Sequence, residues 1–111
     1  MPSPRFPIPQ GTLDMLVLQA VALQPAHGYA IAQRLQEISR EAVQVNHGSL
    51  YPALHRLEEK GWISAAWGTT ENNRRARFYS LTARGRQQLT AESNRWAQLV
   101  AAVGRVMEPA P

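Results

Sequence analysis

The C-terminal part of the chain carries an apolar stripe that a protein of this size cannot bury alone. Thr82 is a good helix N-cap and no proline interrupts the segment that follows, so we expect one helix from Thr82 to about Met107. Such a helix extends about 37 Å, which is longer than a small three-helix core can cover. Leu89, Trp96 and Val103 recur at the seven-residue spacing of a coiled coil. The simplest partner for this stripe is the same helix of a second copy, so the sequence predicts a homodimer.

The predicted dimer interface combines residues from the two ends of the chain. A first helix, expected from Thr12 as N-cap to about Gln24, has few polar positions, which indicates that more than one of its faces is buried. We therefore assign to the interface Leu13, Leu16 and Val17 of this helix, together with Leu89, Trp96, Leu99, Val100, Val103, Val106 and Met107 of the last one.

Two further helices are expected in the middle of the chain. Residues 25–28 form a turn, and the second helix begins at Tyr29 and ends near Ile38. Its residues at buried helical spacing are Tyr29, Ile31, Ala32, Leu35 and Ile38. The third helix begins at Asn46 or at Ser49 and ends at Lys60, before Gly61. The longer version has a kinked first turn, because Pro52 lies beyond the positions that tolerate proline.

Strand character is concentrated on either side of a turn-rich segment. Residues 62–67 and 76–81 predict a hairpin, and residues 68–73 between them lead directly into Arg74 and Arg75. This is the shape of a wing. In the connector 39–45, Val43 and Val45 are candidates for a further short strand.

The excess positive charge of the chain is confined to about a third of its length. The formal net charge is +4, and residues 47–86 hold seven basic and three acidic residues, whereas the acids and bases of the flanking segments cancel. A localised basic patch is typical of a protein that binds a polyanion, although a solvated surface of arginines has the same composition.

Several classes of protein are disfavoured by what the sequence lacks. There is no cysteine, which excludes disulfides and thiolate metal sites. His27, His47 and His55 have no metal-ligand spacing, so we expect neither metal nor cofactor. No paired carboxylates, activated nucleophile or phosphate-binding glycine loop indicates an enzyme. With no signal peptide or membrane span apparent, we expect a soluble, cytoplasmic protein without a membrane partner.

The order of these elements is that of a winged helix-turn-helix with a dimerisation helix appended, and three segments resemble the PadR family of regulators, specifically its short members with one C-terminal helix. These are Gly11-Thr12-Leu13-Asp14 leading to His27-Gly28-Tyr29-Ala30-Ile31, then Gly48-Ser49-Leu50-Tyr51-Pro52-Ala53-Leu54 with Arg56-Leu57-Glu58 and Gly61-Trp62-Ile63, and finally residues 74–82 with Gly85. The expected fold is therefore mainly α with a small β-hairpin. Its parts are an extended proline-rich arm at 1–10, a winged helix-turn-helix at 11–86 and a dimerisation helix at 87–108.

The resemblance implies a homodimer that binds double-stranded DNA and represses transcription until a small effector releases it. The recognition helix, about 47–60, enters the major groove, and two half-sites lie about one helical turn apart, roughly 10 base pairs. The predicted DNA contacts are Ser49, Tyr51, His55, Arg56 and Lys60 on this helix, and Asn72, Asn73, Arg74, Arg75 and Arg77 on the wing at 68–77. The structural alternatives are that Tyr51 packs against the wing and that Arg56 pairs with Glu59 or Glu37.

Trp96 has two interpretations. It is either plain packing at the centre of a self-pairing helix or a stacking platform for a small hydrophobic or planar effector, in a site completed by Leu13, Met15, Leu16 and Val100. The alternative function for the whole chain is a ligand-binding or protein-interaction module without specific DNA binding. A neutral recognition helix and wing would favour that alternative, and this sequence has neither.

Overall fold

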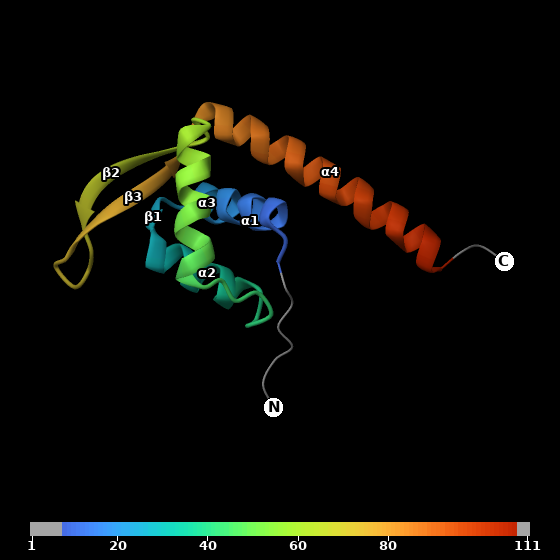
Figure 1. Cartoon of the computed structure of the whole chain (residues 1–111), viewed down its shortest axis with the longest axis horizontal. Helices are drawn as coiled ribbons and strands as arrows, with labels where there is room; N and C mark the ends of the chain where they lie inside the picture. Colours follow the sequence, from blue (N-terminus) through green and yellow to red (C-terminus); the bar gives the residue numbers. More distant parts are fainter. Residues whose placement is uncertain (1–7, 109–111) are drawn as a thin grey trace.

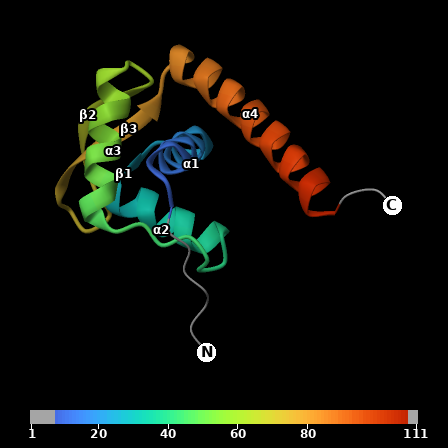
Figure 2. The ribbon, with the colours of Figure 1, turned by 45° about the vertical axis from the view of Figure 1, so that its right-hand side comes forward.

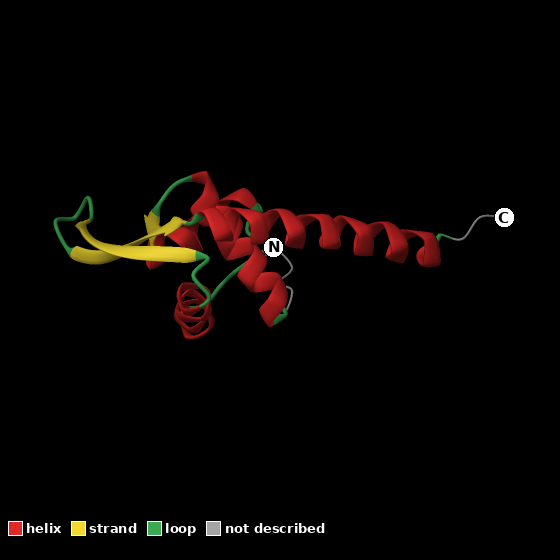
Figure 3. Cartoon of the chain, turned by 90° about the horizontal axis from the view of Figure 1, so that it is seen from above, coloured by secondary structure: helices red, strands yellow, loops and turns green. Residues whose placement is uncertain are grey.

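The computed structural model of the chain describes residues 8–108, and seven elements follow one another in this range. They are α1 (Gln10–Leu23), β1 (Ala26–His27), α2 (Gly28–Ile38), α3 (His47–Glu59), β2 (Ile63–Thr69), β3 (Arg75–Leu81) and α4 (Ala83–Met107). The first three helices form a bundle, from which the β2–β3 hairpin and α4 project in opposite directions (Figures 1 and 3). This is the mainly helical fold with a small hairpin that the sequence predicts. Most of the predicted arm lies outside the described residues.

The core of the protomer is centred on α1, and this position explains why the helix is apolar on several faces. Its buried residues Val17, Leu18 and Val21 pack in one cluster with residues of α2, α3 and the sheet. Leu13 and Val17, assigned to the dimer interface from the sequence, lie in this cluster with 5% and 0% of their surface exposed. That assignment is wrong for both residues, because the core of the same chain already covers them. Leu16 is half-buried.

The start of α1 also differs from expectation. The helix begins at Gln10 after Pro9, whose carbonyl accepts the first helical hydrogen bond from the Leu13 amide at 2.9 Å. Thr12 is therefore inside the first turn and is not the N-cap, and the expected boundary of the arm at residue 10 moves to residue 9.

The sheet has three antiparallel strands in the order β1-β3-β2. β1 lies within the segment predicted as a turn and pairs with β3 through Ala26 opposite Tyr79 and His27 opposite Phe78. Two residues are too few to show an alternating pattern, so the local sequence does not predict this strand. The candidate strand at Val43 and Val45 is absent from the described chain, since both residues lie in an irregular connector and pack half-buried against the core.

α2 and α3 lie against the core with one face each. Ile31 and Leu35 of α2 are buried as predicted, whereas Tyr29 and Ile38, at the two ends of the helix, are 61% and 62% exposed. α3 begins at His47, and the Asn46 side chain accepts a hydrogen bond from the Ser49 amide at 2.9 Å. Asn46 is therefore the cap, and Pro52 lies inside the helix.

α4 is a single helix of 25 residues, capped by the Thr82 hydroxyl, which accepts from the Gly85 amide at 3.0 Å. Its first half packs along α1, with Leu89 half-buried against the core, and Figure 2 shows its second half running beyond the bundle. The exposed apolar residues of this second half are Trp96, Leu99, Val100, Val103, Val106 and Met107.

Candidate nucleic-acid interface

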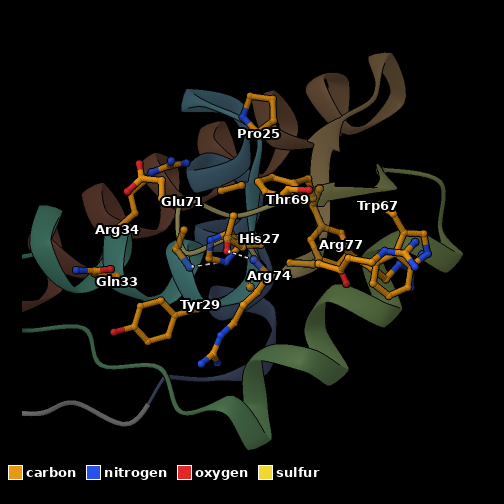
Figure 4. Close-up of a pocket in the computed structure, with 18 of the residues that line it drawn as sticks. Pro25, His27, Tyr29, Gln33, Arg34, Trp67, Thr69, Glu71, Arg74 and Arg77 are labelled. Carbon is orange, nitrogen blue, oxygen red and sulfur yellow. Dashed lines mark hydrogen bonds between the residues drawn. The ribbon is translucent and has the colours of Figure 1, made fainter.

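An open cleft of about 1210 Å³ lies between the helices and the hairpin. It is bordered by the start of α2, the outer face of α3 and the strands and turn of the hairpin, as Figure 4 shows for Tyr29, Arg74 and Arg77 among others. Six of the predicted DNA contacts line it together, namely Tyr51, His55, Asn72, Arg74, Arg75 and Arg77. Ser49, Arg56, Lys60 and Asn73 lie outside the lining.

The outer face of α3 is polar and aromatic rather than basic. Ser49, Tyr51 and His55 are exposed on it. The ring of Tyr51 packs on Gly28 at the start of α2, where a Cβ would approach its hydroxyl oxygen at 2.9 Å. The His47 ring lies between those of Tyr51 and Tyr29, with centroid distances of 5.6 and 6.4 Å. A row of three aromatic rings therefore borders the first turn of α3.

Arg56 is turned away from this face. Its Nη2 donates a hydrogen bond to Asp14 Oδ1 at 2.8 Å, and the two side chains are only 27% and 14% exposed. Neither of the partners considered from the sequence is correct, because Glu59 instead pairs with His55 at 3.1 Å and Glu37 forms no ion pair within residues 8–108. Arg56 thus links α3 to α1 and does not reach the cleft.

The hairpin is longer and its turn tighter than the sequence indicates. The strands extend to Thr69 and from Arg75, and the turn is closed by a hydrogen bond from the Thr70 amide to the Arg74 carbonyl at 2.8 Å. Asn73 adopts the left-handed conformation (φ 61°) that asparagine tolerates better than most residues. The wing defined from the sequence as 68–77 therefore contains the ends of both strands and a five-residue turn.

The arginines of the wing differ in what holds them. Arg77 donates to Glu58 of α3 at 2.7 Å, which ties the hairpin to this helix. Arg74 and Arg75 belong to none of the ion pairs found among residues 8–108. Burial raises the pKa of the Tyr79 phenol beside Arg77, so this phenol stays neutral at ordinary pH and does not neutralise the wing.

Lys60 lies at the C-cap of α3, where its ammonium group is 4.7 Å from the centroid of the Trp62 ring. His27, His47 and His55 do not converge, and the part of the chain that the structure describes contains no cluster of potential metal ligands. None of the helices between residues 8 and 108 combines the length and the apolar character needed to cross a bilayer.

Sequence reasoning missed two aromatic residues that line the cleft, Tyr29 and Trp67. Tyr29 lies three residues before Ala32, a helical spacing that predicts burial on the same face of α2. Trp67 lies on the same face of β2 as the core residue Ile63, yet it is 63% exposed, since the hairpin extends beyond the bundle that would cover it. No local pattern in the sequence distinguishes a strand residue over the core from one on the projecting arm.

A second, smaller cavity of about 310 Å³ lies between the start of α1 and the middle of α4. It brings together Met15 and Trp96 of the predicted effector site and adds Gly11, Thr12, Glu92, Arg95 and Leu99. Leu13, Leu16 and Val100 are outside the lining: Leu13 belongs to the core, Leu16 packs against it, and Val100 is 52% exposed.

A three-helix bundle whose third helix and β-hairpin border one cleft defines the winged helix-turn-helix class of DNA-binding proteins. Residues 17–91 match the Transcriptional regulator PadR-like family. The chain belongs to the PadR-like family of transcriptional regulators, whose members are DNA-binding winged-helix proteins rather than enzymes.

Individual relatives agree with this assignment. The Transcriptional regulator Rv3488 of Mycobacterium tuberculosis is 37% identical over 76 residues, which are 68% of this chain and 67% of that protein. The crystal structure of smu.1704 from Streptococcus mutans UA159 is similar with a TM-score of 0.83 and 25% identity, covering 94% of this chain and 93% of that chain. A PadR family transcriptional regulator from Eggerthella lenta has a TM-score of 0.78 and 30% identity, covering 91% and 86% of the two chains.

Proposed function

We propose that this regulator binds duplex DNA sequence-specifically as a homodimer and represses transcription until a small effector binds. In this proposal α3 enters the major groove, where its outer face meets the base edges, and the wing contacts the flanking backbone or minor groove. Ser49, Tyr51 and His55 are the proposed contacts of α3. Arg74 and Arg75, with Asn72 and Asn73 beside them, are the proposed contacts of the wing.

One observation carries the proposal: the outer face of α3 and the wing border a single cleft, at which two arginines have no acidic partner among the described residues. Phosphate oxygens are strong acceptors for such guanidinium groups. The hydroxyl and imidazole groups of α3 can donate and accept hydrogen bonds at base edges, whereas a cluster of cations would favour any phosphate equally. Arg56 has no part in this proposal because Asp14 already holds it.

Fluorescence anisotropy across a salt series tests this function, with a labelled duplex from the promoter region of the protein's own gene and a random duplex. We expect tight binding to the promoter duplex that weakens steeply with salt. In Arg74→Ala/Arg75→Ala the slope of log affinity against log salt concentration falls by about four, because each subunit of the proposed dimer loses two phosphate contacts. Arg40→Ala/Arg105→Ala removes the same charge outside the cleft and keeps the slope. Promoter binding no tighter than random binding would contradict the proposal and favour a module without specific DNA binding.

The exposed apolar stripe of α4 supports the homodimer. Residues such as Leu99, Val103 and Val106 lie at the spacing of a coiled-coil seam, and among the described residues their side chains remain 54%, 48% and 75% exposed. A second α4 packed against this stripe removes it from water, and two-fold symmetry then presents two α3 helices to successive half-sites, about 10 base pairs apart.

The cavity between α1 and α4 supports a site for a small hydrophobic or planar effector. Trp96 and Met15 supply its apolar surface, and its volume of about 310 Å³ is at the small end of the usual range for ligand sites. In a variant that retains only Trp96 (Trp62→Phe/Trp67→Phe), a planar dye is expected to quench tryptophan fluorescence saturably. If no concentration of dye quenched it, Trp96 would be interface packing only.

A further inference from the structure

Trp67 is a large aromatic side chain on the projecting part of the hairpin, and it is 63% exposed. An indole of this size gains considerable free energy when it is taken out of water, and at this position the protomer does not supply that gain. A single exposed apolar residue is ordinary on a protein surface. The surroundings of Trp67, however, are specific in three respects.

The first is the face of the hairpin on which it lies. Trp67 is directly opposite Arg77 in the register of β2 and β3, and Thr69, two residues on, is opposite Arg75, so these four side chains share one face. The ion pair between Arg77 and Glu58 shows that this face looks toward α3. Trp67 accordingly lines the same cleft as Tyr51 and His55, and Figure 4 shows it beside Arg77.

The second is its charge environment. The guanidinium carbon of Arg75 lies 5.0 Å from the centroid of the indole ring, which is a cation–π arrangement. Arg75 has no acidic partner among the described residues, so the pair presents an apolar ring and an uncompensated positive charge side by side.

The third is the rigidity of its support. On the opposite face of the hairpin, the Phe78 ring packs directly over Gly68, where a Cβ would come to 2.8 Å from Phe78 Cδ2. The backbone next to Trp67 is therefore held from behind. A side chain on a strand held in this way loses little conformational entropy when it binds a ligand.

A ring beside a free cation fits a ligand that alternates apolar and anionic groups, and the sugar–phosphate backbone of DNA has this composition. We propose that Trp67 contacts the backbone of the bound duplex next to the groove occupied by α3, with its indole against a deoxyribose while Arg75 binds the adjoining phosphate. This inference rests on the proposed function and deepens it, because it adds an apolar contact to a wing that otherwise binds by charge. Such a contact strengthens binding to any sequence.

The two kinds of contact respond differently to salt, which makes them separable. Losing a phosphate contact lowers the slope of log affinity against log salt concentration, whereas losing an apolar contact lowers affinity at every salt concentration and leaves the slope unchanged. For Trp67→Ala we expect about a hundredfold weaker binding of the proposed dimer, a tenfold loss for the aromatic contact of each subunit, on promoter and random duplexes alike with an unaltered slope. For Arg75→Ala we expect a slope reduced by about two, one phosphate contact being lost from each subunit of the proposed dimer.

A variant with the indole on the other side of the hairpin is the matched control. Ala66 is exposed and points to the opposite face of β2, so Ala66→Trp/Trp67→Ala keeps the composition but moves the ring away from α3. We expect this variant to bind as weakly as Trp67→Ala. Circular dichroism melting verifies that each variant is folded, and sedimentation verifies that it keeps the oligomeric state of the wild type.

An independent readout uses the complex directly. In Trp62→Phe/Trp96→Phe, which keeps Trp67 alone, acrylamide quenching of the fluorescence is expected to fall at least twofold when a saturating promoter duplex is added. A complex detected by anisotropy in which Trp67 stays fully quenchable, or wild-type affinity in Trp67→Ala, would overturn this inference alone. A lower mass of the oligomer in folded Trp67→Ala would also overturn it, since Trp67 would then belong to an interface between copies. No complex with the wild-type protein would overturn the proposed function as well.

Discussion

Gly85 lies where the first turn of α4 crosses the segment that leads into β2. The Trp62 carbonyl accepts a hydrogen bond from the Thr82 amide at 3.0 Å, and this brings the same carbonyl against the α-carbon of Gly85. A Cβ at residue 85 would overlap the Trp62 oxygen and approach a methyl of Leu81 at 2.9 Å. The neighbour is backbone and cannot move aside as a flexible side chain would. The missing side chain therefore allows α4 to leave the sheet at this angle.

We expect Gly85→Ala to lower the free energy of unfolding by about 1 to 3 kcal/mol, the usual cost of overpacking. Gly104→Ala is the matched control on the same helix, because nothing lies within 4 Å of the Cβ it adds. That change should raise stability by up to about 1 kcal/mol through helix propensity. Urea denaturation followed by circular dichroism, at one protein concentration for all variants, measures both. Equal stabilisation by the two changes would show that the close approach at Trp62 is not restrictive.

At the scale of elements, α1 packs its apolar faces against most of the other elements. Polar contacts also join it to α2 and α3. Arg34 of α2 donates to the last carbonyls of α1, at Ala20 (2.6 Å) and Gln24 (2.8 Å). Asp14 holds Arg56 of α3, whose Nε is buried without a hydrogen-bond partner within residues 8–108. The half-buried guanidinium of Arg56 consequently depends on a single carboxylate for its charge.

We expect Asp14→Leu to lower the free energy of unfolding by about 1 to 3 kcal/mol, because it leaves the Arg56 charge unpaired in a partly buried site. Arg56→Met alone is costly for the converse reason. In Asp14→Leu/Arg56→Met neither charge remains, so its loss should be smaller than the sum of the two single losses by about 1 kcal/mol or more. Losses that simply add in denaturant titrations would mean that the ion pair contributes nothing to joining α1 and α3.

At the scale of the whole molecule, the hairpin and the free half of α4 project from opposite ends of one core. Ile63 and Tyr79 at the base of the hairpin belong to the core and Leu89 of α4 packs against it. The projecting part of the hairpin is left to border the cleft, and the second half of α4 carries the exposed stripe. Binding of DNA and pairing of subunits can therefore be disrupted separately.

Val103 is 48% exposed within the stripe, so Val103→Glu should leave the protomer folded while it places a charge in the proposed subunit interface. We expect sedimentation to show half the mass of the wild-type particle, and promoter affinity to fall because two half-sites are no longer held together. Ala101→Glu is the control, since helical spacing puts residue 101 on the other side of α4 from residue 103. Wild-type mass in Val103→Glu, or monomers with the same promoter affinity as the wild type, would contradict the proposed dimer.

Much of the fold could be predicted because its signals are local. Thr82 is the cap of α4, Gly61 adopts the left-handed conformation (φ 76°) that ends α3, and the two strands of the hairpin lie within two residues of their expected bounds. Each of these follows from a side chain's effect on its own backbone or from the spacing of apolar residues along one element. The basic character of the wing follows in the same way from composition.

The partners of individual side chains were decided only by the tertiary structure. Arg56 pairs with Asp14, 42 residues away, although Glu59 is nearer in the chain. Tyr29 and Trp67 fall in apolar patterns yet line the cleft, and Leu13 and Val17 were assigned to a partner subunit yet lie in the core. The sequence by itself determined the elements, their order and the charge of the wing, because periodicity and capping act within a few residues. Which face of each element is covered, and by what, depends on how distant elements pack, and no local pattern contains that information.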